Sequence, residues 1–576
     1  MDDFFLCLPL AEDWDAYEVY RQLLPMGLSP RAPHTFVSVE GGIVVAFEGI
    51  CFDWPSWTSL DERWSSAAAR MLASDPATFL SSIEGYYRGV IVDTGQRKLL
   101  LFVDHLSACP LYYSARDGRA FVGTDLVPLV RLMGRYGLSA SVSAFGAYCM
   151  LSYSFIIGNR TPIEGVRKVP PATLLSLTDG KSFEYYTWIG QERHRAQSLS
   201  YVAEGLHQRF ERAIERTFGF AAEHRQLLLL SGGLDSRMCL LYARKLGFDD
   251  ISTLCYSQTG YREETIAREV AAANGCNHMF HSLDGGRYLS DIEEGVSATQ
   301  GMTTYRPILS ARSIWRTMDL RFYPLVHNGL LGDSIVGGYC VDKCNSDDRF
   351  SSTTNVALML NPKNSCILSG PYGDEVARFF RKLTEWVPIG SLNSLGQEAF
   401  VLRNRYLNGL VQSYLGLRGL SFASLPFASR DVLEFVFSFP SSIRRDHGLY
   451  FKWMRLFAPE ALRFRWENTG LRPAYGPFDV RPHSPVAEAA RRIDRLSRRN
   501  APEASRNPYI YWMGGDATVM GNMVSYINER MHLLNDEPEL LAFARIATSA
   551  QDIYCVARVA TLLGLLSRCL GLDGGA

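Results

Sequence analysis

One stretch, residues 226–238 (QLLLLSGGLDSRM), constrains the fold of this 576-residue chain more than any other. The four leucines at 227–230 are long enough for a buried strand and too short for a helix. The glycine pair that follows allows a sharp turn and a close approach to a ligand. Asp235 and Ser236 favour the start of a helix that runs to about Leu246. A strand, a glycine turn and a helix N-terminus together direct backbone N–H groups at an anion.

The same stretch differs from the common GxxxxGK[ST] phosphate loop, because its turn is shorter and contains no lysine. It places a carboxylate, Asp235, where phosphate would lie. A carboxylate repels phosphate unless a divalent cation lies between them. The helix N-terminus supplies only about half a positive charge, so we expect Mg²⁺ at this site. An ordinary strand-to-helix turn in an α/β domain is the alternative interpretation.

The string LLLLSGGLDS resembles the pyrophosphatase loop of the N-type ATP-dependent ligases. Those enzymes split ATP between the α- and β-phosphates and activate a substrate as its adenylate. The resemblance implies ATP as the cofactor. It also implies that the pyrophosphate is bound by the residues of the loop, which are Ser231, Gly232, Gly233, Leu234, Asp235 and Ser236.

Length and composition limit the remaining possibilities. A chain of 576 residues should contain two or more domains, and 47% hydrophobic with 21% charged residues is typical of globular proteins. The net charge of −1 gives no reason to expect a nucleic-acid or membrane partner. The acidic N-terminal decapeptide MDDFFLCLPL lacks the basic region of a secretory signal, so a cytoplasmic location is expected. The apolar stretch 553–572 contains Arg558 and Arg568, which favours a buried helix over a membrane span.

The 12 cysteines lie mainly among apolar neighbours, and buried reduced thiols are expected. Cys340 and Cys344 are the closest pair. A metal site there is the weaker interpretation, because no second pair of His or Cys flanks them.

Residues 1–198 are expected to form a layered antiparallel domain. Short runs rich in β-branched, leucine and aromatic residues predict strands at 41–47, 89–93, 98–103, 111–114 and 120–123. Residues 83–113 resemble a stretch of the N-terminal glutaminase domain of glutamine-dependent asparagine synthetases. Asp104 and residues 110–113 match, whereas Val103 replaces an arginine. The resemblance implies an Ntn-hydrolase-like fold.

The first residues depart from that family. Its glutaminases use a cysteine exposed as the first residue after removal of Met, and the α-amino group of that cysteine acts as the base. Position 2 here is Asp2, and Cys7 is internal with no free amine beside it. We therefore expect a glutaminase-like domain without glutaminase activity.

Residues 199–576 are expected to form a second, α/β domain. A lead-in helix is predicted at 199–222, strands at 251–256 and 278–282, and a helix at 263–274. This alternation predicts a doubly wound parallel sheet with its ligand at the carboxyl ends of the strands. The resemblance implies an adenine nucleotide α-hydrolase-like ATP pyrophosphatase with a helical C-terminal elaboration, in which backbone near Leu254 meets the adenine.

A second motif, residues 326–339 (VHNGLLGDSIVGGY), resembles the family string S-G-E-G-x-D-E-x-x-G-G-Y. Asp333 matches the family's Mg²⁺-binding aspartate, and Asn328 and Gly329 become candidates for ATP binding. Leu330 and Ser334 replace two glutamates, the first of which lies by the amino-acid substrate in the family. A glycine-rich loop with a helix-capping aspartate is the alternative. Two carboxylates, Asp235 and Asp333, from separate strand ends suit a hard cation that bridges phosphates.

Lys452 is the third candidate for catalysis. It lies in GLYFKWMRLFAPEAL, which resembles the family's K-W-L-L-R stretch, where the lysine stabilises charge on the phosphate and acyl oxygens. A solvated helix lysine is the alternative. Residues 491–499 carry five arginines, which indicates a solvated face or a docking face for an acidic partner.

The resemblance as a whole implies an asparagine-synthetase-like, AMP-forming amide ligase that joins a small-molecule or peptide carboxylate to an amine or ammonia. A partner protein could supply the substrate or the ammonia. Several alternatives stay open. One is an intramolecular cyclase similar to β-lactam or lasso-peptide macrolactam synthetases. Others are amidation of sugar acids in surface-polysaccharide synthesis, a tRNA-modifying or nucleotide ligase, and an inactive scaffold.

Overall fold

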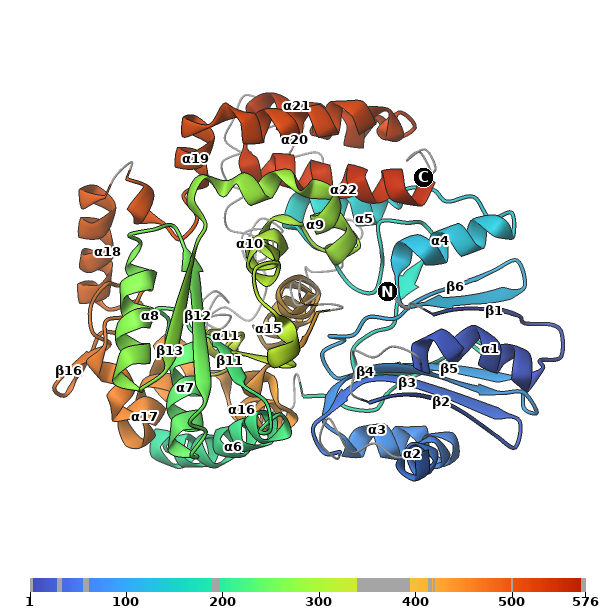
Figure 1. The fold of residues 1–576 in the computed structure, drawn as a ribbon, viewed down its shortest axis with the longest axis horizontal. Coiled ribbons are helices and arrows are strands. Elements are labelled where there is room, and N and C mark those ends of the chain that lie inside the picture. Colours follow the sequence, from blue (N-terminus) through green and yellow to red (C-terminus); the bar gives the residue numbers. More distant parts are fainter. Residues whose placement is uncertain are drawn as a thin grey trace.

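The computed structural model describes residues 4–27, 34–54, 62–188, 197–338, 394–412, 417, 420–498 and 501–570. Figure 1 shows antiparallel sheets stacked on one side of the molecule and a parallel sheet on the other. Helices from the C-terminal end of the chain lie across both halves. We call the two halves the N-terminal lobe and the C-terminal lobe.

The N-terminal lobe contains two antiparallel sheets. The four-stranded sheet has the order β1 (Phe5–Pro9), β7 (Arg119–Gly123), β6 (Tyr112–Arg116), β8 (Arg167–Lys168). The six-stranded sheet has the order β10 (Ser182–Glu184), β9 (Thr173–Ser176), β5 (Lys98–Val103), β4 (Gly85–Asp93), β3 (Ile43–Cys51), β2 (His34–Glu40). Each of the five strands expected from the sequence is present. The strand at 98–103 (β5) has the expected bounds, and the other four have at least one shifted end.

Alternating side chains build the core between these sheets. Leu6 and Leu8 of β1 join Val44, Val92 and Leu101 of the other sheet in one buried cluster. Their neighbours on each strand point outward to helices, as the two-residue period of a strand requires. Helix α1 (Ala16–Gly27) packs on β2 and β3, α2 (Glu62–Ser74) also covers β2 and β3, and α4 (Leu126–Arg135) covers β7. The result is a layered α/β arrangement.

The helices of this lobe were not predicted from the sequence. They are α1, α2, α3 (Pro76–Ser82), α4 and α5 (Ala144–Tyr153). For α5 the reason is burial, because every one of its residues except the first is buried. A helix buried on all sides has no polar stripe and so no 3.6-residue pattern for the sequence to reveal.

The C-terminal lobe is built on a five-stranded sheet in which every pairing is parallel. Its order is β13 (Asn277–Ser282), β12 (Ile251–Ser257), β11 (Gln226–Leu229), β14 (Leu325–Asn328), β15 (Phe422–Ser424). The chain moves from β11 outward to β13 and then crosses to β14 on the other side. This is the doubly wound parallel sheet that the sequence predicted, and its order reverses between β11 and β14.

Helices surround this sheet as expected. The lead-in helix is α6 (Leu199–Phe220), the loop helix is α7 (Asp235–Lys245), and α8 (Arg262–Ala273) packs on β12 and β13. The described part of this lobe also contains α9 (Ile292–Thr299), α10 (Arg306–Trp315), α11 (Gly332–Ile335), α15 (Ser394–Val401), a π-helix (Leu402–Leu410), α16 (Arg430–Phe437), α17 (Gly448–Phe457), α18 (Pro485–Ser497), α19 (Tyr509–Gly515), α20 (Ala517–Arg530), α21 (Pro538–Ala550) and α22 (Ile553–Leu570).

Helix α22 is the apolar C-terminal stretch. Among the described residues it is the one helix with the length and hydropathy of a membrane span, and 83% of it is buried inside the protein. Arg558 explains its internal charge. The side chain is buried and donates to the Ser154 hydroxyl at 2.7 Å and to the Leu151 carbonyl at 3.1 Å, at the C-terminus of α5. The stretch is therefore a buried helix, as the sequence predicted.

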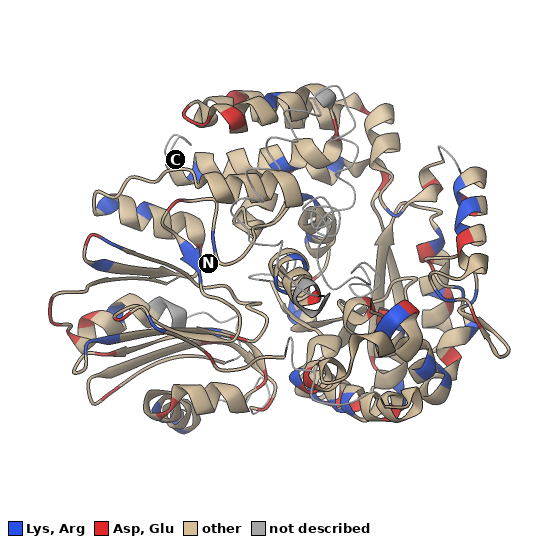
Figure 2. Ribbon diagram, turned by 180° about the vertical axis from the view of Figure 1, so that it is seen from behind, with Lys and Arg blue, Asp and Glu red and all other residues tan. Residues whose placement is uncertain are grey.

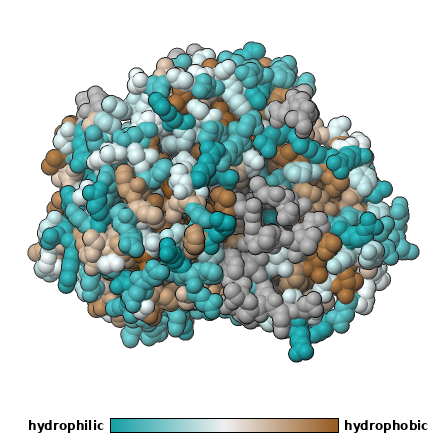
Figure 3. All heavy atoms as spheres, viewed as in Figure 1, coloured by the Kyte–Doolittle hydropathy of each residue, from teal (hydrophilic) through white to brown (hydrophobic). Residues whose placement is uncertain are grey.

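The surface agrees with the balanced composition. Acidic and basic residues are interspersed over both lobes (Figure 2), and polar and apolar side chains alternate across the face in Figure 3. The described cysteines are thiols rather than disulfides.

Candidate active site

The loop after β11 is closed by its two serines. The Ser231 N–H donates to the Ser236 hydroxyl at 3.0 Å, and the two hydroxyl oxygens are 3.0 Å apart. The Gly233 N–H donates to the Ser231 hydroxyl at 3.2 Å. These bonds hold the turn without a ligand. The first turn of α7 keeps N–H groups that have no acceptor within the helix, and these are the groups suited to an anion.

Gly232 is required by close packing. A Cβ atom at this position would lie 2.8 Å from the Cβ of Glu467, and its carbonyl accepts the Glu467 N–H at 3.0 Å. Burial raises the pKa of the neighbouring Glu263 carboxyl, and Arg506 acts to lower it. Gly232 has no positive φ. The absence of a side chain therefore matters here more than any unusual turn.

Arg237 holds the loop from beneath. Its side chain is buried and donates to the carbonyls of Ala461 and Arg465, each at 2.6 Å, and to Gly232 at 3.3 Å. The segment after α17 is thereby fixed to the first loop. Arg237 was not predicted as part of the site, although a charged residue inside an apolar helix pattern indicates a buried polar contact.

Glycines let the second motif approach the first. A Cβ at Gly329 would lie 2.4 Å from the backbone nitrogen of Ser236, and one at Gly332 would lie 2.6 Å from the Asp235 Cγ. Asn328 accepts the Leu330 N–H at 2.9 Å and so shapes the turn after β14. The two motifs, about a hundred positions apart in the chain, are therefore in direct contact.

The two aspartates lie side by side at this contact. Asp235 Oδ2 accepts the backbone N–H of Asp333 at 3.0 Å, and Asp235 Oδ1 accepts the Tyr450 hydroxyl at 2.9 Å. The His447 Nε2 lies 2.6 Å from Asp333 Oδ1. Burial, followed by the nearby Asp333 carboxylate, raises the pKa of Asp235 to about 7. The site thus concentrates negative charge that the protein leaves poorly compensated.

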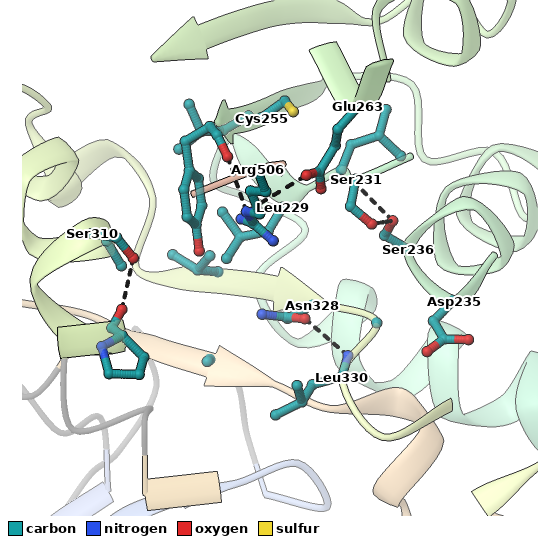
Figure 4. A pocket seen from close by; sticks show the side chains of 18 of the residues that line it. Leu229, Ser231, Asp235, Ser236, Cys255, Glu263, Ser310, Asn328, Leu330 and Arg506 are labelled. Atoms are coloured by element: carbon teal, nitrogen blue, oxygen red, sulfur yellow. Dashed lines mark hydrogen bonds and ion pairs between the residues drawn. The ribbon is translucent and has the colours of Figure 1, made fainter. Parts of the chain in front are cut away.

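A cavity of about 480 Å³ lies at the carboxyl ends of the parallel strands (Figure 4). Three kinds of wall surround it. The two motifs contribute a polar wall, the end of β12 contributes a second wall with the Arg506–Glu263 ion pair, and α10 with β15 contributes a largely apolar third wall. The residues of these walls include Ser231, Asp235, Ser236, Asn328 and Gly329; Leu254, Cys255, Tyr256, Glu263 and Arg506; and Ser310, Ala311, Trp315, Leu417 and Ala423.

The structure brings together most of the site residues predicted from the sequence. Six of them line the cavity, namely Ser231, Asp235, Ser236, Leu254, Asn328 and Gly329. Gly232, Gly233 and Leu234 form the loop behind this wall, and Asp333 lies beside Asp235. Tyr450 and His447, which contact the aspartates, were not predicted.

Lys452 is the exception. It lies on α17 two residues after Tyr450, and residues two apart leave a helix on roughly opposite sides. It is not among the residues that line the cavity. The structure therefore does not bring Lys452 together with the two aspartates, and its role in charge stabilisation stays a prediction.

The donor set fits Mg²⁺ bound together with a polyphosphate. Within the described residues, no group of three or more His, Cys, Asp or Glu side chains could hold a metal alone. Mg²⁺ in nucleotide sites is commonly bound by one or two carboxylates, with phosphate oxygens and water as the other ligands. Asp235 and Asp333 meet this requirement, and a cation would offset the repulsion that raises the pKa of Asp235.

Two other features singled out in the sequence are the Cys340–Cys344 pair and the N-terminal residues. Cys340 and Cys344 lie outside the described residues, as does Asp2. Cys7 is buried in the middle of β1, and its backbone N–H donates to the Gln22 side chain at 2.9 Å. A backbone amide so placed provides no free amine to act as a base.

One comparison with known proteins agrees with the resemblance seen in the first loop. Residues 205–400 match the family model described as asparagine synthase. A search of curated proteins gave no match. A solved structure titled "Structure of the allosteric regulatory enzyme of purine biosynthesis" aligns with 12% identity and a TM-score of 0.18. The alignment covers 43% of this chain and 62% of that one, and the superposition is too poor to compare the folds.

Proposed function

For a chain that is asparagine synthetase-like over residues 205–400, we propose an ATP-dependent ligase that adenylates a substrate carboxylate, releases pyrophosphate and joins the acyl group to an amine or ammonia. One observation carries the proposal. Asp235 and Asp333 follow the two strands between which the sheet order reverses, and they meet at the edge of the 480 Å³ cavity. Ligands of doubly wound sheets bind at this position.

The walls of the cavity suit the parts of ATP. The strand end Leu254–Tyr256 with its apolar side chains suits the adenine, and the first turn of α7 suits the phosphates. Asp235 and Asp333 would hold Mg²⁺, which supplies charge neutralisation to the phosphates when bound. Tyr450 fixes the orientation of Asp235 through its hydroxyl.

The apolar wall has a separate task. Trp315, Leu417 and Ala423 also line the cavity. An acyl-adenylate is hydrolysed if water reaches it, and an apolar wall limits that access. Leu330 lies in the same cavity where the family places a glutamate near its amino-acid substrate. We therefore propose a carboxylate substrate other than aspartate.

The test is the fate of the carboxylate oxygen. Candidate carboxylic acids labelled with ¹⁸O are incubated with ATP, Mg²⁺ and an amine or ammonium. Adenylation transfers one ¹⁸O atom to AMP and releases pyrophosphate. Formation of ADP and phosphate, or AMP without the label, would contradict the proposal.

The product also separates the remaining alternatives. A cyclase converts one substrate molecule into a product lighter by one water, whereas an intermolecular ligase or a sugar-acid amidase incorporates the added amine. A scaffold releases no pyrophosphate with any substrate. The nitrogen source in our proposal is free ammonia, ammonia from a partner protein, or an amine on the substrate itself.

We further propose the arrangement around this reaction. Residues 1–198 form a glutaminase-like unit, and residues 199–576 form the synthetase unit. The described thiols, most of them buried, and the need for ATP favour the cytoplasm. The mixed surface charge favours neither a nucleic-acid nor a membrane partner.

A further inference from the structure

A second cavity of about 300 Å³ lies where the two lobes meet. Its N-terminal wall includes Lys168 of β8 and Tyr186. Its C-terminal wall is one face of the π-helix Leu402–Leu410. This helix directly follows α15, which lies between the lobes in Figure 1. We call this space the interlobe cavity.

Lys168 is an unusual residue for such a wall. It is only 1% exposed, and its Nζ donates to the Asn408 Oδ1 at 2.7 Å. An ammonium carries three N–H donors. Over the described residues, that amide oxygen is the one hydrogen-bond acceptor recorded for it. Burial lowers the pKa of Lys168 to about 8, which leaves the side chain mostly protonated at neutral pH.

The neighbouring amides cannot complete this environment, because they are already in use. Asn408 Nδ2 donates to the carbonyls of Ile156 at 3.0 Å and Gly158 at 2.8 Å. Asn404 accepts the Gly158 N–H at 2.7 Å and donates to the Phe400 carbonyl at 2.8 Å. The two asparagines therefore connect the lobes, and the remaining N–H groups of Lys168 can bind a ligand in the cavity.

Among the described residues, none of the charged groups nearby accepts a hydrogen bond from Lys168. Asp104 attracts it, but the Asp104 carboxylate accepts N–H groups of its own loop, including those of Leu106 and Ala108. His105 is neutral, because burial lowers its pKa to about 3 and its Nε2–H donates to the Ala428 carbonyl. At the cavity edge, Glu184 is paired with Arg403 at 3.3 Å.

Part of the wall is apolar and is formed by Pro170, Pro171, Tyr186, Trp188 and Leu407. Polar side chains, including Asn159, Thr173 and Thr187, line the remainder. The Arg430 guanidinium stacks over the Tyr186 ring, 3.9 Å from the ring centroid, and helps fix the plane of that ring. A buried cation beside flat apolar surfaces suits a ligand with one negative end and an apolar body.

We propose that the interlobe cavity binds a small carboxylic acid, with the carboxylate on Lys168 and an apolar body against Pro171, Tyr186 and Leu407. This site is separate from the one for ATP and does not depend on the proposed reaction. The π-helix borders both sites, because Leu410 at its end lines the first cavity. Such helices often occur at functional sites.

The test uses benzoate as the probe and benzamide as its neutral counterpart of the same shape. Binding to the full chain is measured by calorimetry. We expect benzoate to bind at least about tenfold more tightly than benzamide, since one charge-assisted bond is worth about 1.5–3 kcal/mol. Lys168→Met should abolish this preference. Lys181→Met removes a lysine that is 85% exposed and should leave binding unchanged.

A folding control and a second variant complete the test. Lys168→Met replaces a buried charge with an apolar chain of similar length and should fold, as judged by circular dichroism. Should it not fold, Leu407→Phe, which narrows the apolar part and leaves Lys168 in place, should weaken benzoate binding. Benzoate affinity that is equal in wild type and in either folded variant overturns the proposal, as does displacement of benzoate by an equal concentration of inorganic phosphate.

Discussion

The surroundings of Asp235 disfavour the ionised form of its carboxyl group. Burial and Asp333 both raise its pKa, and Tyr450 and the Asp333 N–H offset only part of that effect. If a cation completes the site, Asp235→Asn and Asp333→Asn should each lower pyrophosphate release by on the order of 10²-fold or more. The measurement is the rate at saturating ATP across a Mg²⁺ titration.

A matched control is Asp319→Asn, which changes an aspartate far from the site that pairs with the exposed Arg321. It should keep wild-type turnover. Near-normal turnover of Asp235→Asn or Asp333→Asn, with an unchanged Mg²⁺ requirement and a native circular dichroism spectrum, would show that the aspartate concerned is not a metal ligand.

Lys452 provides a contrasting prediction at the same scale. A lysine that stabilises the transition state would lower kcat by ~10²–10³ when replaced by alanine, with little change in ATP affinity. If its position on α17, on the side away from Tyr450, keeps Lys452 out of the site, the loss for Lys452→Ala should instead stay below about tenfold. Single-turnover adenylate formation with a separate ATP-binding measurement decides the question. A 100-fold drop in kcat would support the catalytic role predicted for Lys452 from the sequence.

The residue scale also shows what the sequence could predict. Ser231, Asp235 and Asp333 lie in short strings whose chemistry is local, so their spacing was enough. Tyr450 lies 215 positions from Asp235, and the Arg237 contacts span 224 and 228 positions. Such partners are brought together by the tertiary fold, and no periodicity in one chain records them.

At the scale of elements, Gly332 tests how closely the two motifs must pack. A methyl group there would lie 2.6 Å from the Asp235 Cγ, so Gly332→Ala must displace one motif. We expect the free energy of unfolding to fall by about 1–3 kcal/mol and pyrophosphate release to be lost. The measurements are urea unfolding and turnover.

Gly521→Ala is the matched control. Gly521 is in the middle of α20, and a Cβ there would meet nothing within 4 Å. Alanine should stabilise this helix by up to about 1 kcal/mol. If Gly332→Ala behaved like Gly521→Ala, the close contact between the motifs would not be needed.

His327 links three strands and gives the protein a pH dependence. Its Nε2 lies 2.6 Å from the Gln226 Oε1 and its Nδ1 lies 2.7 Å from the Ser424 hydroxyl. The Gln226 Nε2 donates elsewhere, so Oε1 accepts and the His327 Nε2 carries the proton. Burial lowers the pKa of His327 to about 3.

This lowered pKa makes the stability of the folded chain depend on pH. The unfolded chain binds a proton near pH 6.5 and the folded chain does not, so stability is lost as the pH falls from 6.5 towards 3. His327→Leu should be less stable at pH 7 by about 1–3 kcal/mol, because it leaves Gln226 and Ser424 without a partner. Between pH 4 and 6 the free energy of unfolding of the variant should change less with pH than that of the wild type. The difference between the two slopes should be about 1.4 kcal/mol per pH unit. Equal slopes for both proteins would exclude a neutral His327.

Elements of the C-terminal lobe were predicted well because strands and amphipathic helices alternate there. The runs at β11 and β12 are short and apolar, and α6 repeats its buried residues at helical spacing. The N-terminal helices were missed for different reasons. In α5 no polar face exists, and in α3 (Pro76–Ser82) the helix is too short for a period to be seen.

For the whole molecule, the contact between the lobes should make them unfold together. The Arg430 N–H donates to Glu84 at 3.1 Å, and its Nη1 donates to the Ile83 carbonyl at 2.8 Å. Glu84 also pairs with Arg216 of α6. We expect one unfolding transition by both fluorescence and circular dichroism, and Arg430→Met should lower the free energy of unfolding by about 1–3 kcal/mol.

Arg321→Met tests whether any lost arginine has this effect. Its side chain is 89% exposed and pairs only locally with Asp319, so the change should stay within about 0.5 kcal/mol. Two separate transitions in the wild-type protein would show that the lobes are stable independently.

The contact between Arg558 and α5 also has a consequence for protein synthesis. Arg558 lies 404 positions after Ser154, so α5 leaves the ribosome long before the helix that covers it. At roughly 5–20 residues per second, this delay is about 20–80 s. During that time the largely apolar α5 lacks the partner that buries it and completes its C-terminus. The N-terminal lobe therefore cannot complete its packing until the last helix of the chain has been synthesised.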